Sequence, residues 1–138
     1  MKIRLDFVTN SSSTSFVLIC YDEFNAKNFI EAVGIDEKSP FKDIYMQLFE
    51  SFKEDLNNAR ESIATHRWNK EHKSFEEFVK QLYSQETLDK ILDAESKGIP
   101  VYMGWLRSDN NDVESFFCTD CFIIDEKRFY IDATVDGW

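Results

Sequence analysis

The sequence predicts an α+β fold: an antiparallel sheet of about five strands, built from an N-terminal hairpin plus C-terminal strands, with three to four central helices packed on one face. Three observations lead to this prediction. Strand-like patterns occupy both ends of the chain, helix-like spacing of apolar residues fills the middle, and the helices are bunched rather than alternating with strands. Such an order favours helices lying against an antiparallel sheet.

The length and composition predict one domain spanning residues 1–138. A chain of 138 residues can bury a core without disulfides or metals. The core material is present, since 43% of the residues are hydrophobic and 13 are Phe. No linker, repeat or low-complexity tract divides the chain, apart from a short serine run near the N-terminus.

Two strands are expected in the first 21 residues. Ile3, Leu5 and Phe7 alternate with polar residues, which indicates a half-buried strand over residues 2–8. Residues 16–21 (FVLICY) are apolar without interruption, as in a strand that is covered on both faces. The polar segment between them, residues 9–15, is predicted to be the turn of a hairpin.

The first two helices are expected between residues 25 and 67. Residues 25–33 form a short helix that ends at Gly34, a residue suited to the left-handed cap position. Ser39 and Pro40 then supply an N-cap followed by proline at the first helical position. Apolar residues recur at helical spacing behind them, so this second helix is expected to continue to about Arg67.

Two further helices and the C-terminal strands complete the predicted fold. Ser74 opens a capping box, Ser84 can cap the next helix, and Gly98 and Pro100 end it. Residues 101–106 are expected to form a strand. Residues 122–124 and 128–131 are predicted to form a hairpin joined through residues 125–127, and residues 113–118 fit either a helical turn or an edge strand.

The charge balance limits the classes of molecule that this chain can bind. The net charge is −10, from 26 acidic and 16 basic residues, so most of the surface repels phosphate backbones and anionic lipids. We therefore expect no direct nucleic-acid binding and no membrane association, and a basic protein partner fits better. No stretch reaches the about 18 apolar residues of a membrane span. Asp6 interrupts the first apolar residues, which argues against a signal peptide. An odd count of three Cys does not suit a disulfide framework. Both observations favour a cytoplasmic protein.

The seven small polar residues from Thr9 to Ser15 are the first candidate site. Hydroxyls and backbone amides here can form a nest for a phosphate or another anion. The segment has no glycine and no lysine, which phosphate-binding loops normally use. It is equally explained as a solvated loop. The residues predicted to bind are Thr9, Asn10, Ser11, Ser12 and Ser13.

The pair Cys118 and Cys121 is the second candidate site, because a Cys-x-x-Cys spacing occurs in zinc half-sites and in redox pairs. Zinc needs four ligands, and Cys20, His66 and His72 are the other candidates. None has a matching spacing, so the cysteines are also explained as small buried hydrophobic residues. No cofactor is predicted, with zinc retained as an alternative.

No known catalytic motif occurs in the sequence: it has no nucleophile elbow, HExxH, Walker loop or GxGxxG. The most favoured function is therefore a small acidic, non-enzymatic interaction protein that acts on a protein partner. Exposed carboxylates can stand in for phosphates at a basic site. A metal or redox module at the cysteine pair and an enzyme using the Thr9–Ser15 segment are the alternatives. The candidate acidic faces are Glu50, Glu54, Asp55 and Glu61, and Glu86, Asp89, Asp93 and Glu95.

The segment from Asp6 to Phe16, DFVTNSSSTSF, resembles the start of a group of uncharacterised proteins from Gram-positive anaerobes and their phages that share DFVTNSSSxSF. The resemblance covers about the first 20 residues, and the tail from Gly104 to Trp138 is loosely similar to the same group. Because the members have no established activity, the resemblance implies no chemistry. It implies a protein related to this bacterial and phage group, and it makes a functional role of the Thr9–Ser15 segment as favoured as a solvated loop.

Overall fold

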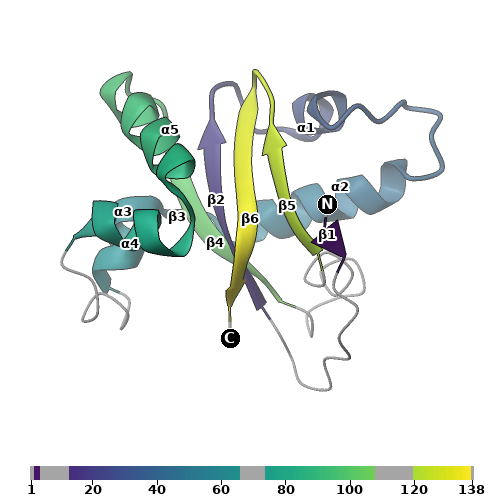
Figure 1. Cartoon of the computed structure of the whole chain (residues 1–138). Helices are drawn as coiled ribbons and strands as arrows, with labels where there is room; N and C mark the ends of the chain where they lie inside the picture. The colour runs from purple at the N-terminus through teal and green to yellow at the C-terminus, as the bar shows by residue number, and fades with distance from the viewer. Residues whose placement is uncertain (1, 4–12, 66–73, 108–119, 138) are drawn as a thin grey trace.

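Six strands form one antiparallel sheet in the order β1-β5-β6-β2-β4-β3 (Figure 1). The computed structural model describes residues 2–3, 13–65, 74–107 and 120–137. In that part of the chain the predicted α+β class and the antiparallel sheet are confirmed. The strands are β1 (Lys2–Ile3), β2 (Ser13–Cys20), β3 (Asn57–Asn58), β4 (Val101–Arg107), β5 (Asp120–Asp125) and β6 (Phe129–Gly137).

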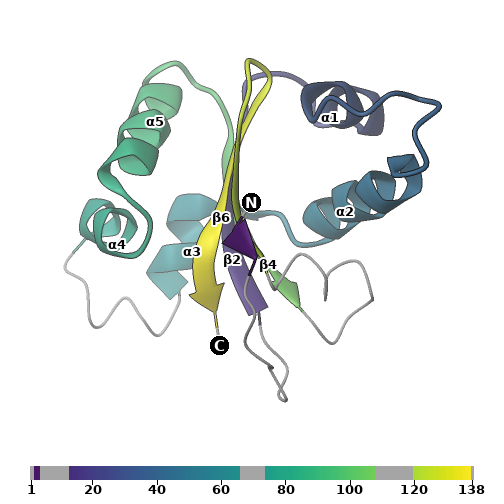
Figure 2. The ribbon, with the colours of Figure 1, turned by 45° about the vertical axis from the view of Figure 1, so that its right-hand side comes forward.

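Five helices among the described residues cover both faces of the sheet (Figure 2). Phe16 and Leu18 of β2 face a core cluster with the first two helices, whereas Val17 and Ile19 face a second cluster with the other three. The prediction of helices on one face was therefore wrong in this detail, because a strand that is apolar on both sides needs cover on both. The helices are α1 (Ala26–Ala32), α2 (Lys42–Glu54), α3 (Ala59–Thr65), α4 (Phe75–Leu82) and α5 (Gln85–Ser96).

The predicted N-terminal hairpin does not form. β1 pairs with β5 at one edge of the sheet, whereas β2 lies between β4 and β6. Both hydrogen-bonding edges of β2 are occupied by long C-terminal strands. Alternation of apolar residues identifies a strand, but it does not specify which strand will pair with it.

β2 also begins earlier than predicted, inside the polar segment. Ser13, Thr14 and Ser15 pair with Arg107, Leu106 and Trp105 of β4. Thr14 and Ser15 are buried, so this end of the segment belongs to the sheet and is not part of a solvated loop. Residues 9–12 lie outside the described part of the chain.

The long helix expected to reach Arg67 ends at Glu54, and from Asp55 the chain crosses the edge of the sheet from one face to the other. β3 pairs with β4 at this edge, and α3 begins on the opposite face. The crossing passes so close to Gly104 that a Cβ there would overlap the Asp55 carbonyl oxygen and lie 2.7 Å from Phe16 Cζ. Gly104 therefore permits a backbone approach that any side chain would block.

Most predicted helix ends are confirmed. Ser74 accepts a hydrogen bond from Glu77 N and Ser84 accepts one from Thr87 N, as N-caps do. Gly34 and Gly98 have positive φ angles where helices end. The start of α2 was misplaced, because Ser39 caps a turn by accepting a hydrogen bond from Phe41 N and the helix begins at Lys42.

The C-terminal strands follow the prediction more closely. β4 occupies the expected range with one added residue, and β5 and β6 form the predicted hairpin, in which Glu126 N donates to Phe129 O. Residues 113–118 lie outside the described residues. Among the helices that are described, none is both long and apolar enough to cross a bilayer.

We expect Gly104→Ala to lower the free energy of unfolding by about 2–3 kcal/mol, because the new methyl group must displace the Asp55 backbone or the Phe16 ring. Gly34→Ala is the matched control, because no atom lies near the added methyl group and only the positive φ angle of Gly34 opposes a side chain. This substitution should lower the free energy of unfolding by about 1 kcal/mol. Urea unfolding of both variants measures the difference. An equal loss in the two variants would contradict the close approach at Gly104.

Candidate functional site

The described end of the polar segment is anchored to α4. The Ser15 hydroxyl lies 2.5 Å from the Tyr83 hydroxyl, and Ser15 is only 2% exposed. Burial is the largest cause that raises the pKa of Tyr83 above its ordinary value, so Tyr83 is a neutral phenol at physiological pH. Of the predicted binding residues, Ser13 starts β2, and the structure does not describe Thr9, Asn10, Ser11 or Ser12.

A buried carboxylate, Asp132, lies at the centre of a second polar cluster between β6 and α5. Asp132 is 1% exposed. Its Oδ2 accepts a hydrogen bond of 2.6 Å from the Thr87 hydroxyl, and its Oδ1 accepts from the Thr134 amide at 3.1 Å and the Thr134 hydroxyl at 2.6 Å. Among the described residues no basic side chain forms an ion pair with it. Three donors therefore replace the water that the carboxylate loses on burial.

Tyr130 extends this cluster. Its hydroxyl lies 2.6 Å from Thr87 Oγ1. Because Thr87 gives its only hydroxyl proton to Asp132, Tyr130 is the donor in this contact. Burial is the largest cause that raises the pKa of Tyr130 to about 12, with the Thr87 hydrogen bond opposing the rise and the nearby Asp132 contributing to it. The cluster is thus a chain of donors that ends on one carboxylate.

These groups position helices. Ser15, Thr87, Tyr130 and Asp132 are buried, and their hydrogen bonds join β2 and β6 to the end of α4 and the start of α5. Asp132 was not expected as a buried polar residue, because the last predicted strand ended at residue 131. The signal that could have found it is alternation, since Tyr130, Asp132 and Thr134 lie on one side of an extended strand.

The cysteines are far apart. Cys121 belongs to β5 and Cys20 to β2, with β6 between these strands. Cys20 pairs with Phe129 at one end of β6, whereas Phe122, the residue after Cys121, pairs with Ala133, about 13 Å further along β6. One zinc ion cannot bind both Cys20 and Cys121, because zinc–sulfur bonds are about 2.3 Å long.

The other predicted zinc ligands lie outside the described residues. Cys118, His66 and His72 are not described, so the Cys118–Cys121 pair stays a prediction. In the described ranges no group of three or more His, Cys, Asp or Glu residues could hold a metal ion. The Cys20 thiol is buried, and desolvation raises its pKa to about 12, which makes it a poor nucleophile.

Exposed carboxylates form the most accessible candidate site. Glu86, Asp89 and Asp93 are exposed on α5 at spacings of three and four residues, which places them in one row. This row is called the α5 acidic stripe. The fourth predicted member, Glu95, is turned to Arg60 instead, with its Oε2 2.6 Å from Arg60 Nε.

The other predicted acidic face is divided by the fold. Glu50 and Glu54 lie on α2, whereas Glu61 lies on α3 across the sheet (Figure 2). Asp55 is engaged at the crossing, where its Oδ2 accepts a hydrogen bond of 2.8 Å from Trp105 N. The prediction that these residues form one face was therefore wrong, because it assumed a single continuous helix.

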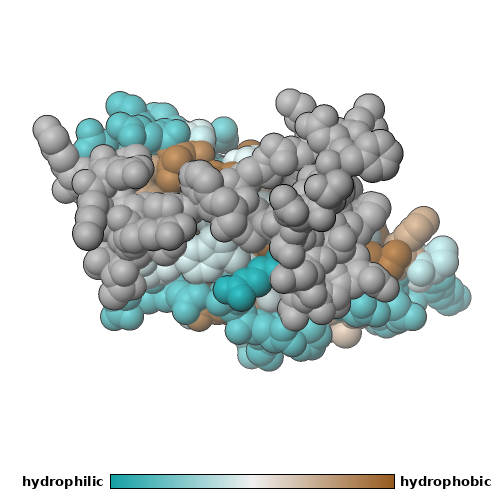
Figure 3. Space-filling view, turned by 90° about the horizontal axis from the view of Figure 1, so that it is seen from below, coloured by the Kyte–Doolittle hydropathy of each residue, from teal (hydrophilic) through white to brown (hydrophobic). Residues whose placement is uncertain are grey.

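Several cations are held by carboxylates within the described chain. Arg60 joins three helices, since it pairs with Glu76 of α4 and Glu95 of α5 and lies 4.5 Å above the Phe75 ring. Arg128 pairs with Glu31 at 2.6 Å. These pairs leave a surplus of carboxylates on the surface. Seen from below, the described surface is mostly hydrophilic, with hydrophobic residues confined to small patches (Figure 3).

We expect Thr87→Val to lower the free energy of unfolding by about 2–3 kcal/mol, because it removes a donor from the buried Asp132 carboxylate without changing the side-chain shape. A double-mutant cycle with Asp132→Ala, which removes the acceptor, isolates this interaction when measured by urea unfolding. The second substitution should cost less in the Thr87→Val background than alone. Strictly additive losses would show that the hydrogen bond contributes nothing to stability.

We also expect stability to fall between pH 9 and 12. Cys20 and Tyr130 have pKa values raised to about 12 from 9.0 and 10.0, so the unfolded chain releases their protons at lower pH than the folded chain. Their stabilising contribution is complete below the unfolded values and is lost as the pH rises through the folded values. In urea unfolding at stepped pH, Cys20→Ala should move the onset from about pH 9 to about pH 10. An unchanged onset would contradict this assignment.

The comparisons with known proteins provide no independent indication of function. No family model, no curated protein and no solved structure matches this chain. The likeness of Asp6–Phe16 to the DFVTNSSSxSF group stays a prediction. The function is therefore inferred from the charges and contacts of the described residues.

Proposed function

We propose that this chain is a small acidic, non-enzymatic interaction protein that binds a basic surface of a protein partner through the α5 acidic stripe. The observation that carries the proposal is the row of three exposed carboxylates, Glu86, Asp89 and Asp93, on the solvent side of α5. A net charge of −10 adds long-range attraction for a basic partner.

The spacing of the stripe suits a site that normally receives phosphates. A helix rises 1.5 Å per residue, so these carboxylates follow one another at about 5 Å along the helix axis. One strand of a nucleic-acid duplex carries a charge about every 3.4 Å of its axis. The stripe can therefore place several negative charges on a row of lysine and arginine side chains at once.

The neighbouring cations of α5 leave most of the stripe available. Lys90 points toward the sheet, where its Nζ lies 5.0 Å from the centroid of the Tyr130 ring and 3.5 Å from Asp125. Lys97 pairs with Asp93 at 3.0 Å and lies at the C-terminal end of the helix. Glu86 has no ion pair in the described part of the chain, so this end of the stripe carries uncompensated charge.

Two other functions stay predictions. They are a metal or redox module at Cys118 and Cys121, and an enzyme built on the Thr9–Ser15 segment. The described residues contain no geometry that favours either over the interaction function. Cytoplasmic localisation and a phage relation likewise belong to the proposal and rest on composition and on the N-terminal string.

The test is affinity capture from a nuclease-treated lysate of the native host at low and moderate salt, with mass-spectrometric identification. The triple variant Glu86→Gln, Asp89→Asn, Asp93→Asn should bind the captured partner about tenfold more weakly, because three exposed ion pairs of about 0.5 kcal/mol are lost. The matched control is Asp43→Asn, Glu50→Gln, Glu54→Gln, which changes the net charge equally on α2, across the sheet.

The two variants distinguish binding through the α5 acidic stripe from binding that depends only on the net charge. A partner that is lost from the α5 variant but retained by the α2 variant, and that is released as the salt concentration rises, agrees with the proposal. Equal loss from both variants would show that only the net charge matters. Binding that is unchanged in both variants and insensitive to salt would reject the acidic stripe as the contact surface.

A further inference from the structure

The outer edge of β5 has backbone groups available beyond its short pairing with β1. β1 pairs only with Asp120 and Cys121, and in the described chain no strand lies outside the stretch from Ile123 to Asp125. Figure 1 shows β1 beside the lower end of β5 alone. An open edge of this kind is a template for an added strand.

The hairpin geometry shows which groups face outward. Glu126 N donates to Phe129 O at 2.9 Å, so Glu126 and Phe129 form a hydrogen-bonded pair. In an antiparallel ladder such pairs alternate with pairs that do not share hydrogen bonds. The register places Ile123 opposite Asp132 and Asp125 opposite Tyr130 as pairs of the second kind. The N–H and C=O groups of Ile123 and Asp125 therefore point away from β6.

A cavity of about 400 Å³ lies next to this edge, between β5 and the helices on that face. Ala32 and Val33 of α1 and Tyr45 and Leu48 of α2 contribute one side, and Phe122 and Ile124 contribute the other. On the opposite face of the sheet the Ile123 side chain is 49% exposed. A strand added at this edge would place alternate side chains in the cavity and over Ile123.

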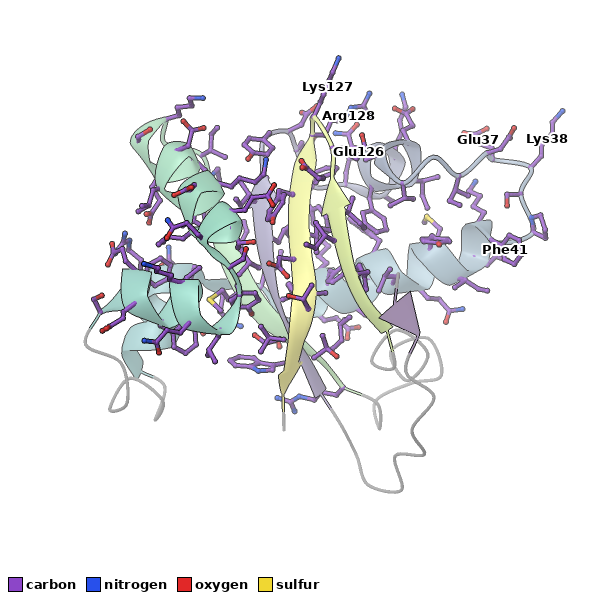
Figure 4. The ribbon with its side chains drawn as sticks, viewed as in Figure 1. Glu37, Lys38, Phe41, Glu126, Lys127 and Arg128 are labelled. Carbon is purple, nitrogen blue, oxygen red and sulfur yellow. The ribbon has the colours of Figure 1, made fainter. Side chains whose placement is uncertain are left out.

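The charges at the cavity favour a basic occupant. Glu126 lines it, and no described lining residue is basic. The Asp125 carboxylate lies on the Ile123 face of the sheet, 3.5 Å from Lys90 of α5, whereas Glu126 forms no ion pair with any described residue. Lys127 points beyond the tip of the hairpin, away from the cavity (Figure 4). Arg128 is held by Glu31 on α1.

We propose that β5 accepts an extended segment of a basic partner as an additional strand, with apolar side chains at every second position in the cavity and a lysine or arginine at Glu126. Backbone hydrogen bonds to Ile123 and Asp125 supply affinity, and the cavity and Glu126 supply selectivity. A second copy of this chain does not suit the edge, because it would bring the same carboxylates and a charge of −10. This inference adds a site separate from the α5 acidic stripe.

The test uses a synthetic acetylated pentapeptide with a lysine at each end and threonine, valine and threonine between them, which spans the edge from Glu126 to Phe122 without reaching the β1 pairing. Either strand direction then brings a lysine to Glu126. Titration followed by NMR should shift the amide signals of Ile123 and Asp125. Ile123→Pro should weaken binding about tenfold, because proline removes an outward N–H and leaves the β5–β6 hydrogen bonds intact. Ile123→Thr keeps this N–H and is the matched control.

Charge exchange gives a second readout that does not depend on how the proline variant folds. Glu126→Lys should weaken the binding of the lysine-ended peptide and strengthen the binding of the same peptide with glutamate at each end. The α5 triple variant should bind the lysine-ended peptide as the unaltered protein does, which separates this site from the proposed function.

Other results would overturn the inference. These are equal affinity for the two peptides, shifts confined to α5, and binding that Ile123→Pro and Glu126→Lys both leave unchanged. A concentration-dependent dimer joined at β5 would also overturn it, because a second copy would then be the occupant. Analytical ultracentrifugation of the unaltered protein and of Ile123→Pro distinguishes that case.

Discussion

The burial of β2 on both of its faces is the constraint on which the rest of the structure depends. Phe16, Val17, Leu18 and Ile19 are fully buried, with successive side chains in opposite core clusters. Such a strand requires a pairing partner on each edge and helices on each side of the sheet. β4 and β6 provide the edges, and both come from the C-terminal third of the chain. The fold is therefore closed by contacts between residues that are far apart in the sequence.

Covering two faces with consecutive helices requires the chain to change sides, and it does so once, at Asp55. The space at Gly104 lets the backbone pass, and the Asp55 carboxylate holds the crossing by accepting the Trp105 amide. On the second face, polar contacts supplement the apolar core. Ser15 bonds Tyr83 at the end of α4, and Asp132 bonds Thr87 at the start of α5. These directional bonds position helices that apolar packing alone would allow to slide.

The same arrangement decides which charges face solvent. Arg60 and Arg128 form ion pairs between elements, and exposed carboxylates that remain lie on α2, on α5 and at the β5–β6 turn, among other places. The α5 acidic stripe and the β5 edge offer different chemistry. The stripe presents charge alone, whereas the edge presents backbone hydrogen-bonding groups beside a cavity that is lined by apolar side chains and Glu126. A basic partner with an extended apolar segment would suit both surfaces.

The α+β class, the presence of the described strands from residue 101 onward and the helix ends at Asn25, Ser74, Ser84, Gly34 and Gly98 follow from the sequence alone, although β6 continues to Gly137, beyond the predicted end at residue 131. These features depend on local periodicity and on backbone groups that nearby side chains satisfy. Of the candidate site, the sequence identified the acidic residues of α5, because helical spacing alone aligns them. The pairing of β1 with β5, the end of α2 at Glu54 and the burial of Asp132 beside Thr87 depend on tertiary contacts. Strand partners, chain crossings and buried polar contacts depend on residues that are distant in the sequence, and local patterns carry no information about which of these residues will meet.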